Sequence, residues 1–156
     1  MARLLDVSGK NSLNLSFHQR RKVIKSYDDE INNWIPIDFE IRVYDKSYKI
    51  YPEVAPSLNM YEINLMLSKL RVIIENIHSK KDFEKVAIST YEFYYELEFF
   101  HLKEDELIEC TIWTFETSRT NGEIQNVQRG FRFSVSVESL TEFRGTLELE
   151  LNQIVN

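Results

Sequence analysis

Residues 91–100, YEFYYELEFF, alternate two kinds of side chain almost without interruption. The apolar parity holds Phe93, Tyr95, Leu97 and Phe99, and the other parity holds Glu92, Tyr94, Glu96 and Glu98. Because successive side chains of a strand point to opposite faces, this pattern predicts a strand with one apolar face and one acidic, aromatic face. So much acid on one face of a strand needs an explanation.

A second clean alternation begins at Trp34. Its inward parity would be Ile37, Phe39, Ile41 and Val43, and its outward parity Asp38, Glu40, Arg42 and Tyr44. A two-residue turn at Asp45–Lys46 would place Val43 opposite Tyr48. The next inward pair would be Ile41 and Ile50. Residues 13–17 predict an earlier strand, whereas residues 18–33 form a polar connection that could be a loop or a short helix.

Two stretches have the period of a helix. In residues 57–79, Asn59 and Glu62 have the spacing of a capping box, and the apolar residues that follow predict a helix of about five turns. That stripe is Ile63, Met66, Leu67, Leu70, Ile73, Ile74 and Ile77. Near the C-terminus, Ser139 and Glu142 suggest a second cap, followed by the stripe Leu140, Phe143, Leu147, Leu151 and Ile154. Close packing against the sheet could explain Gly145 in this helix.

Between the helices, residues 83–90, 91–102, 106–118 and 130–137 read as consecutive antiparallel strands. A turn at Lys103–Glu104 predicts that Phe99 lies opposite Ile108. A turn at Asn121–Gly122, a strong hairpin signal, predicts the pairs Ile112 with Phe131, Cys110 with Phe133 and Ile108 with Val135. The predicted fold class is α+β: a mostly antiparallel meander of about six to seven strands, one long central helix and one C-terminal helix.

This register also defines an outward set. Glu98 would face Glu109, Glu96 would face Thr111, Tyr94 would face Trp113, and Glu92 would face Phe115. Directly opposed like charges destabilise an antiparallel pair, and nothing in the fold requires them.

We therefore expect a partner-binding surface, because interfaces are rich in aromatic anchors and carboxylates can receive Lys or Arg. Its residues would be Glu92, Tyr94, Glu96, Glu98, Glu109, Trp113 and Phe115. Alternatively, the N-terminal strand or a second copy covers the aromatics, or the face is an ordinary solvated one.

Composition narrows the class of partner. The chain has 156 residues, 43% of them hydrophobic, which fits a single domain at 1–156. Its 19 Lys and Arg against 25 Asp and Glu leave a net charge of -6, so we expect no nucleic-acid partner and an electrostatic preference for a basic protein. The start lacks a secretory signal, no segment approaches a membrane span, and the single Cys110 fits a reducing compartment. The expected location is the cytoplasm, without a membrane partner.

Motifs for catalysis are missing from the sequence. His18, His78 and His101 have no HExxH or CxxC context, and neither GxSxG nor a glycine-rich phosphate loop is present. His101 could meet Glu98 or Glu106. A glycosidase-like carboxylate pair among the strand glutamates would need a deep cleft, which a short sheet with two helices rarely provides. We expect no catalytic residue, cofactor or metal, and therefore no enzyme. The short basic runs at 19–22 and 79–81 lack interleaved aromatics.

The order of elements resembles the small bacterial immunity proteins of the WapI type. The residues behind this resemblance are Asn33–Trp34–Ile35 with the alternating IDFEIRV, the helix SLNMYEINLMLSKL, the strand YEFYYELEF, the strand with Trp113, and the terminal LELNQIV. The resemblance covers residues 11–155. It implies a protein that inhibits the toxin domain of a polymorphic toxin, often a nuclease with a basic groove, by binding to it. No catalytic residue follows from the family.

Strand parity, not the resemblance, places the interface. On that basis Glu96, Glu98 and Glu109 would mimic phosphates, and Trp113 or Tyr94 would be an anchor. The alternative is a structural or regulatory domain that forms a homodimer through the same face. A third possibility is a small-molecule site between the long helix and the sheet.

Overall fold

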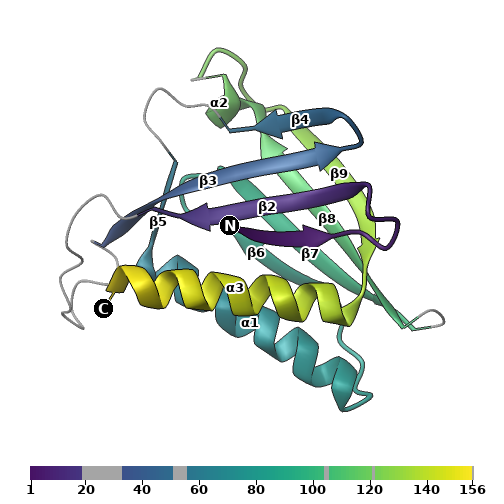
Figure 1. Cartoon of the computed structure of the whole chain (residues 1–156). Helices are drawn as coiled ribbons and strands as arrows, with labels where there is room; N and C mark the ends of the chain where they lie inside the picture. The colour runs from purple at the N-terminus through teal and green to yellow at the C-terminus, as the bar shows by residue number, and fades with distance from the viewer. Residues whose placement is uncertain (19–32, 51–55, 104–105, 121, 156) are drawn as a thin grey trace.

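The computed structural model describes residues 1–18, 33–50, 56–103, 106–120 and 122–155, which form two antiparallel sheets and three helices (Figure 1). The first sheet has the order β1-β2-β3-β4, with β5 paired to β3. Its strands are β1 (Ala2–Leu5), β2 (Asn11–Phe17), β3 (Trp34–Val43), β4 (Lys46–Lys49) and β5 (Ser57–Asn59). The second sheet contains β6 (Val86–Ser89), β7 (Tyr95–Leu102), β8 (Leu107–Phe115) and β9 (Gln128–Val135). The helices are α1 (Met60–His78), α2 (Glu116–Arg119) and α3 (Val137–Val155).

The α+β class and the two long helices agree with the prediction, but the strands divide into two sheets where one meander was expected. Strands β1 and β5 were not predicted. They have four and three residues, which is too short for an alternating pattern to stand out. The basic run at 19–22 lies outside the described residues, as does most of the connection at 18–33.

The core lies between the two sheets, where their apolar parities face each other. From the first sheet it takes Leu13, Leu15, Phe17, Ile37, Phe39 and Ile41, and from the second Tyr95, Leu97, Phe99, Ile108, Cys110 and Ile112. Phe39 and Tyr95 stack across the gap with ring centroids 4.5 Å apart. Helices α1 and α3 contact each other and run along one side of both sheets (Figure 1). Among the described helices, none has the length and apolar composition that a membrane crossing requires.

Helix α1 begins as predicted. The Asn59 side chain accepts a hydrogen bond from the Glu62 N–H at 2.9 Å, and the Glu62 carboxylate accepts one from the Asn59 N–H at 2.9 Å. The predicted apolar stripe is buried, with Ile77 partly so. The Tyr95 hydroxyl lies 3.8 Å from the Met66 sulfur, so side chains join this helix directly to the second sheet.

Helix α3 buries its predicted stripe but begins earlier than expected. Its first residue is Val137, and Ser136 caps it by accepting a hydrogen bond from the Ser139 N–H at 3.2 Å. The predicted cap at Ser139 is therefore wrong. The Ser139 hydroxyl accepts from the N–H of Leu5 and donates to its carbonyl, both at 2.9 Å, which fastens the helix to β1. Close packing does not explain Gly145, because a Cβ there would meet nothing within 4 Å.

The predicted pairing of β8 with β9 is confirmed. Ile112 faces Phe131, Cys110 faces Phe133 and Ile108 faces Val135. The connection between these strands is longer than the predicted two-residue turn. The chain leaves the ladder after Phe115, forms α2 and returns at Gln128. Asn121 lies outside the described residues.

The other two predicted hairpins are each wrong by two residues. Strands β7 and β8 pair Phe99 with Cys110 and close at Leu102 and Leu107. Strands β3 and β4 pair Ile41 with Tyr48 around a turn at positions 44–45, where Tyr44 has φ 54°. A shift of two keeps every side chain on its face. Within β3, β7 and β8 the inward parity was therefore right, while the cross-strand partners were not.

Candidate partner-binding surface

The predicted surface residues divide between a strand face and a turn. Glu96, Glu98, Glu109, Trp113 and Phe115 belong to β7 and β8, on the face of the second sheet that points away from the core. We call this face, with the neighbouring side chains of β6 and β9, the outer face of the second sheet. Glu92 and Tyr94 lie in the turn before β7, which begins only at Tyr95. Phe93, which parity assigned to the core, is 64% exposed in that turn.

The two-residue shift changes which side chains meet across the outer face. Glu98 lies opposite Thr111, Glu96 opposite Trp113, and Glu109 opposite Phe100. The predicted pair of opposed glutamates, Glu98 and Glu109, does not exist. The repulsion between directly opposed carboxylates, on which the predicted binding role of this face partly rested, is therefore absent from the structure.

Each carboxylate of the outer face has a partner in the chain itself. Glu96 accepts a short hydrogen bond from the Ser89 hydroxyl. Glu98 forms an ion pair with Lys85. Glu109 lies 3.5 Å from the Arg132 guanidinium. A basic partner would have to share these carboxylates with cations already present.

Glu98 is the most buried of these acids, with only 8% of its surface exposed. Burial alone would raise its pKa, but hydrogen bonds from Lys85 and Trp113 outweigh it and hold the pKa below the usual value of a glutamate. The group is therefore charged at neutral pH and already satisfied. Its carboxylate holds Lys85 and Trp113 in place and is not free to bind a partner.

The Trp113 ring packs against Gly130 of β9. The two residues are opposite each other in the ladder, and a Cβ at position 130 would come 2.6 Å from the Trp113 ring. The pairing of β8 with β9 continues on both sides of Gly130 without a bulge. Gly130 provides the space that the indole occupies.

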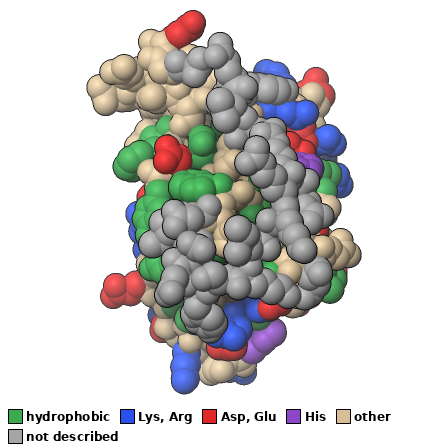
Figure 2. Space-filling view, turned by 90° about the vertical axis from the view of Figure 1, so that its left-hand side faces the viewer, with side chains coloured by type: hydrophobic (Ala, Val, Ile, Leu, Met, Phe, Trp, Pro, Cys, Tyr) green, Lys and Arg blue, Asp and Glu red, His purple; other side chains and the backbone are tan. Residues whose placement is uncertain are grey.

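Aromatic side chains cluster at the end of the second sheet where β7 begins and β8 ends. We call this cluster the aromatic end; its residues are Tyr61, Tyr91, Phe93 and Phe115. The Tyr61 and Tyr91 rings stack with centroids 6.3 Å apart, and Phe93 meets Phe115 edge-on at 5.8 Å. A surface pocket of about 460 Å³ lies beside Phe93 and Phe115. Figure 2 shows hydrophobic side chains exposed on this side of the molecule, with an acidic side chain among them.

Helix α2 borders the aromatic end and is held by a buried carboxylate. Glu116 forms ion pairs with Arg119 at 2.7 Å and with Arg129 at 3.3 Å. The hydrogen bond from Arg119 is the main cause that holds the Glu116 pKa below its usual value. Sequence reasoning missed this site, because its three members converge only once the chain has turned through α2.

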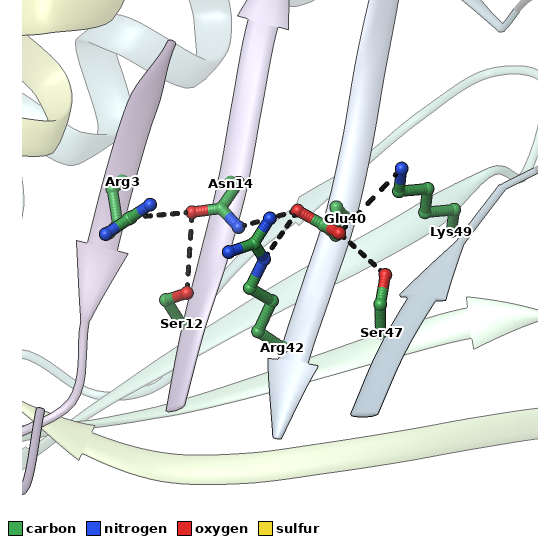
Figure 3. A network of polar contacts seen from close by, with 7 residues as sticks. All are labelled: Arg3, Ser12, Asn14, Glu40, Arg42, Ser47 and Lys49. Carbon is green, nitrogen blue, oxygen red and sulfur yellow. Dashed lines mark hydrogen bonds and ion pairs between the residues drawn. The ribbon is translucent and has the colours of Figure 1, made fainter. Parts of the chain in front are cut away.

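The first sheet also has a polar outer face, but its side chains form one connected network (Figure 3). Glu40 of β3 accepts hydrogen bonds from Asn14 at 3.0 Å, Arg42 at 2.9 Å and Ser47 at 2.6 Å. Asn14 accepts a further bond from Arg3 at 3.1 Å. Although they lie on an outward face, Asn14 is 1% exposed and Glu40 is 9% exposed. The network ties β1, β2, β3 and β4 together, and no functional role was predicted for it.

The structure also places two other residues that the sequence singled out, His101 in β7 and Cys110 in β8. His101 stacks on Phe83 and lies 3.9 Å from Asp82, where Glu98 or Glu106 had been expected. Cys110 is buried, and burial raises the pKa of its thiol. Within the described ranges, no three His, Cys, Asp or Glu side chains group as a metal site would require.

Comparison with known proteins identifies a family. The model of a family described as the Immunity protein WapI-like family matches residues 4–154, nearly the whole chain. Searches of curated proteins and of solved structures returned no significant match.

Proposed function

Because the chain belongs to the WapI-like immunity protein family, we propose that it neutralises a cognate bacterial toxin domain by binding to it directly. The family match over residues 4–154 is the observation on which this proposal rests. The protein would act in the cytoplasm and without a reaction of its own. Occupying the active surface of a toxin, or blocking access to it, requires complementary shape and charge and no catalytic group.

The outer face of the second sheet, together with Glu92 and Tyr94, is the proposed binding surface. Its support is chemical: Trp113 and Phe115 supply aromatic area, and strands β7 and β8 hold them on a rigid scaffold. The net charge of -6 would speed the approach of a basic toxin domain. Since Glu96, Glu98 and Glu109 already have partners in the chain, the aromatic side chains would contribute more of the affinity than the carboxylates.

Co-expression tests the proposal. The C-terminal domain of a large secreted protein encoded beside this gene should arrest growth when expressed alone. With this chain present, growth should recover and the two proteins should purify together. If every such neighbouring domain is harmless or fails to bind, the immunity function is wrong.

Substitution of Trp113 and a mass measurement separate toxin binding from self-association. Trp113→Ala should keep the fold, as thermal unfolding would show, and weaken the complex. If the isolated wild-type protein has the mass of a dimer in light scattering and Trp113→Ala has that of a monomer, the same face joins two copies of the chain instead.

A further inference from the structure

Phe93 combines two properties that stability does not explain. Its backbone has φ 50°, in the left-handed region that costs a bulky residue about 1 kcal/mol or more. Its side chain is 64% exposed, so burial in the core does not compensate for that strain. Glycine or asparagine would form the same turn more easily. A strained, exposed aromatic side chain is a feature of sites that meet another molecule.

Hydrogen bonds hold the turn around Phe93 in one conformation. The Phe93 N–H donates to the Thr90 carbonyl at 3.2 Å, and the Ser118 hydroxyl donates to the Phe93 carbonyl at 3.0 Å. The Tyr91 N–H donates to the Glu62 carboxylate at 2.6 Å, which ties the turn to the start of α1. The ring is therefore presented on a fixed support, and binding would lose little conformational entropy.

Apolar surface continues from Phe93 to the segment that follows α2. The pocket beside the ring is lined by Phe115 and by Val127, which is itself exposed. Tyr91, two residues before Phe93 in the same turn, stacks on Tyr61 of α1, and both tyrosines are exposed. Clusters of rigid aromatic side chains around a pocket are typical of the centre of a protein interface.

Among the residues that the structure describes around this pocket, the charge without an ion-pair partner is negative. Glu92 is exposed, and within the described ranges it forms no hydrogen bond or ion pair. The nearby cations Arg119 and Arg129 are engaged by Glu116. The pKa of Tyr94 is raised, first by burial and next by the charge of Glu92, which agrees with a negative field at the turn.

We propose that Phe93 is the main anchor of the toxin interface, and that the toxin domain places an apolar side chain in the pocket and a lysine or arginine against Glu92. The proposal rests on the immunity function and makes it more specific, because it moves the centre of binding from the paired glutamates of the strands to the aromatic end.

Phe93→Gly tests the anchor without endangering the fold, because glycine suits a positive φ. Its thermal stability should equal or exceed that of the wild type. Its affinity for the purified toxin domain encoded beside the gene, measured by titration calorimetry, should fall by about 30-fold or more. The matched control is Tyr44→Gly, which removes another exposed aromatic residue with φ 54°, from the β3–β4 turn of the other sheet. It should bind as the wild type does.

Glu92→Lys tests the charge. It should slow association with the toxin domain at low salt, and the difference should fade at high salt. Glu84→Lys makes the same charge change at the opposite end of the second sheet, before β6, and should have the smaller effect.

The outcomes separate this proposal from the function on which it rests. If the wild type neither binds the toxin domain nor protects cells, the immunity function fails and the anchor fails with it. If the wild type binds and Phe93→Gly binds equally well, only the anchor is wrong. Equal losses in Phe93→Gly and Tyr44→Gly would also overturn it, because the effect would not be specific to the aromatic end.

Discussion

The outer faces of the two sheets are both polar, yet they differ in how their carboxylates are satisfied. On the first sheet, one nearly buried carboxylate, Glu40, collects partners from β2, β3 and β4. On the second sheet, three carboxylates each have a separate contact, with Ser89, Lys85 or Arg132. A connected buried network stabilises a sheet, and its polar groups are already hydrogen-bonded and therefore not free to bind a partner. Separate pairs beside exposed aromatic side chains leave a surface that another protein can use.

The comparison shows that the acidity of a strand does not reveal whether its acids are available. Residues 92–98 look like a row of free carboxylates in the sequence, and the structure pairs those that belong to β7. At this end of the sheet the exposed side chains are Tyr91, Phe93 and a single acid of the row, Glu92. We therefore expect substitutions on the outer face of the first sheet to lower stability, and substitutions on the outer face of the second sheet to weaken binding.

Glu40→Ala should have the largest effect on stability. It leaves Arg42 without its ion pair and the buried Asn14 amide without an acceptor, so the free energy of unfolding should fall by about 2–4 kcal/mol. Urea denaturation measures the change. Glu109→Ala, which removes one half-exposed pair on the second sheet, should lower it by less than about 1 kcal/mol. Equal losses would remove the distinction between the faces.

The pH dependence of the same site sharpens the contrast. Burial would raise the pKa of Glu40, but hydrogen bonds from Ser47, Arg42 and Asn14 lower it from the ordinary 4.5. A lowered folded pKa means that the stabilisation is complete above about pH 4.5 and is lost as the pH falls through the folded value. The difference in unfolding free energy between wild type and Glu40→Gln should therefore shrink below pH 4.5. A constant difference from pH 7 to about pH 3 would contradict this.

Gly130→Ala perturbs the second sheet in a defined place. The new methyl group would collide with the Trp113 ring, so we expect a loss of about 1–2 kcal/mol in unfolding free energy and a weaker toxin complex. In the double variant with Trp113→Ala, the alanine at 130 should cost little, because the ring is gone. If Gly130→Ala is equally harmful with and without Trp113, the contact between them is not the cause.

Gly145 lies in α3 and on neither outer face. Gly145→Ala should have the smallest effect on the free energy of unfolding, and it should raise that energy where the other substitutions lower it. Nothing lies within 4 Å of the added Cβ, so the helix should gain about 0.5–1 kcal/mol. Thermal unfolding would show a higher midpoint, and affinity for the toxin domain should not change. A loss of affinity would mean that α3 takes part in binding.

The faces of the strands could be predicted from the sequence, whereas the neighbours across them could not. Apolar alternation assigns Leu97, Phe99 and Ile112 to the core whatever the turn length, provided that the shift is even. Whether Phe99 meets Ile108 or Cys110 depends on how many residues the turn takes, and apolar pairs are formed either way. The pairing of β8 with β9 was predicted correctly even though the connection was not. The chain forms α2 where a tight turn was expected, and the two strands still pair as predicted.

In the candidate site, too, the sequence predicts the face of a side chain better than its neighbours. Trp113 and the strand glutamates were placed on the correct face by parity. Phe93 was placed in the core because its turn contains no glycine or proline to signal a break, and a positive φ at phenylalanine has no signature in sequence. The ion pairs of Lys85 with Glu98 and of Arg129 with Glu116 join residues that only the completed topology brings together.

Hydrogen exchange of the free protein and of its complex with the toxin domain tests the central claim most directly. If the second sheet and its aromatic end form the interface, exchange should slow in peptides covering residues 90–95 and 115–130 and stay unchanged at 38–49. Slower exchange confined to residues 38–49, with none at 90–95, would place the partner on the first sheet and contradict the account.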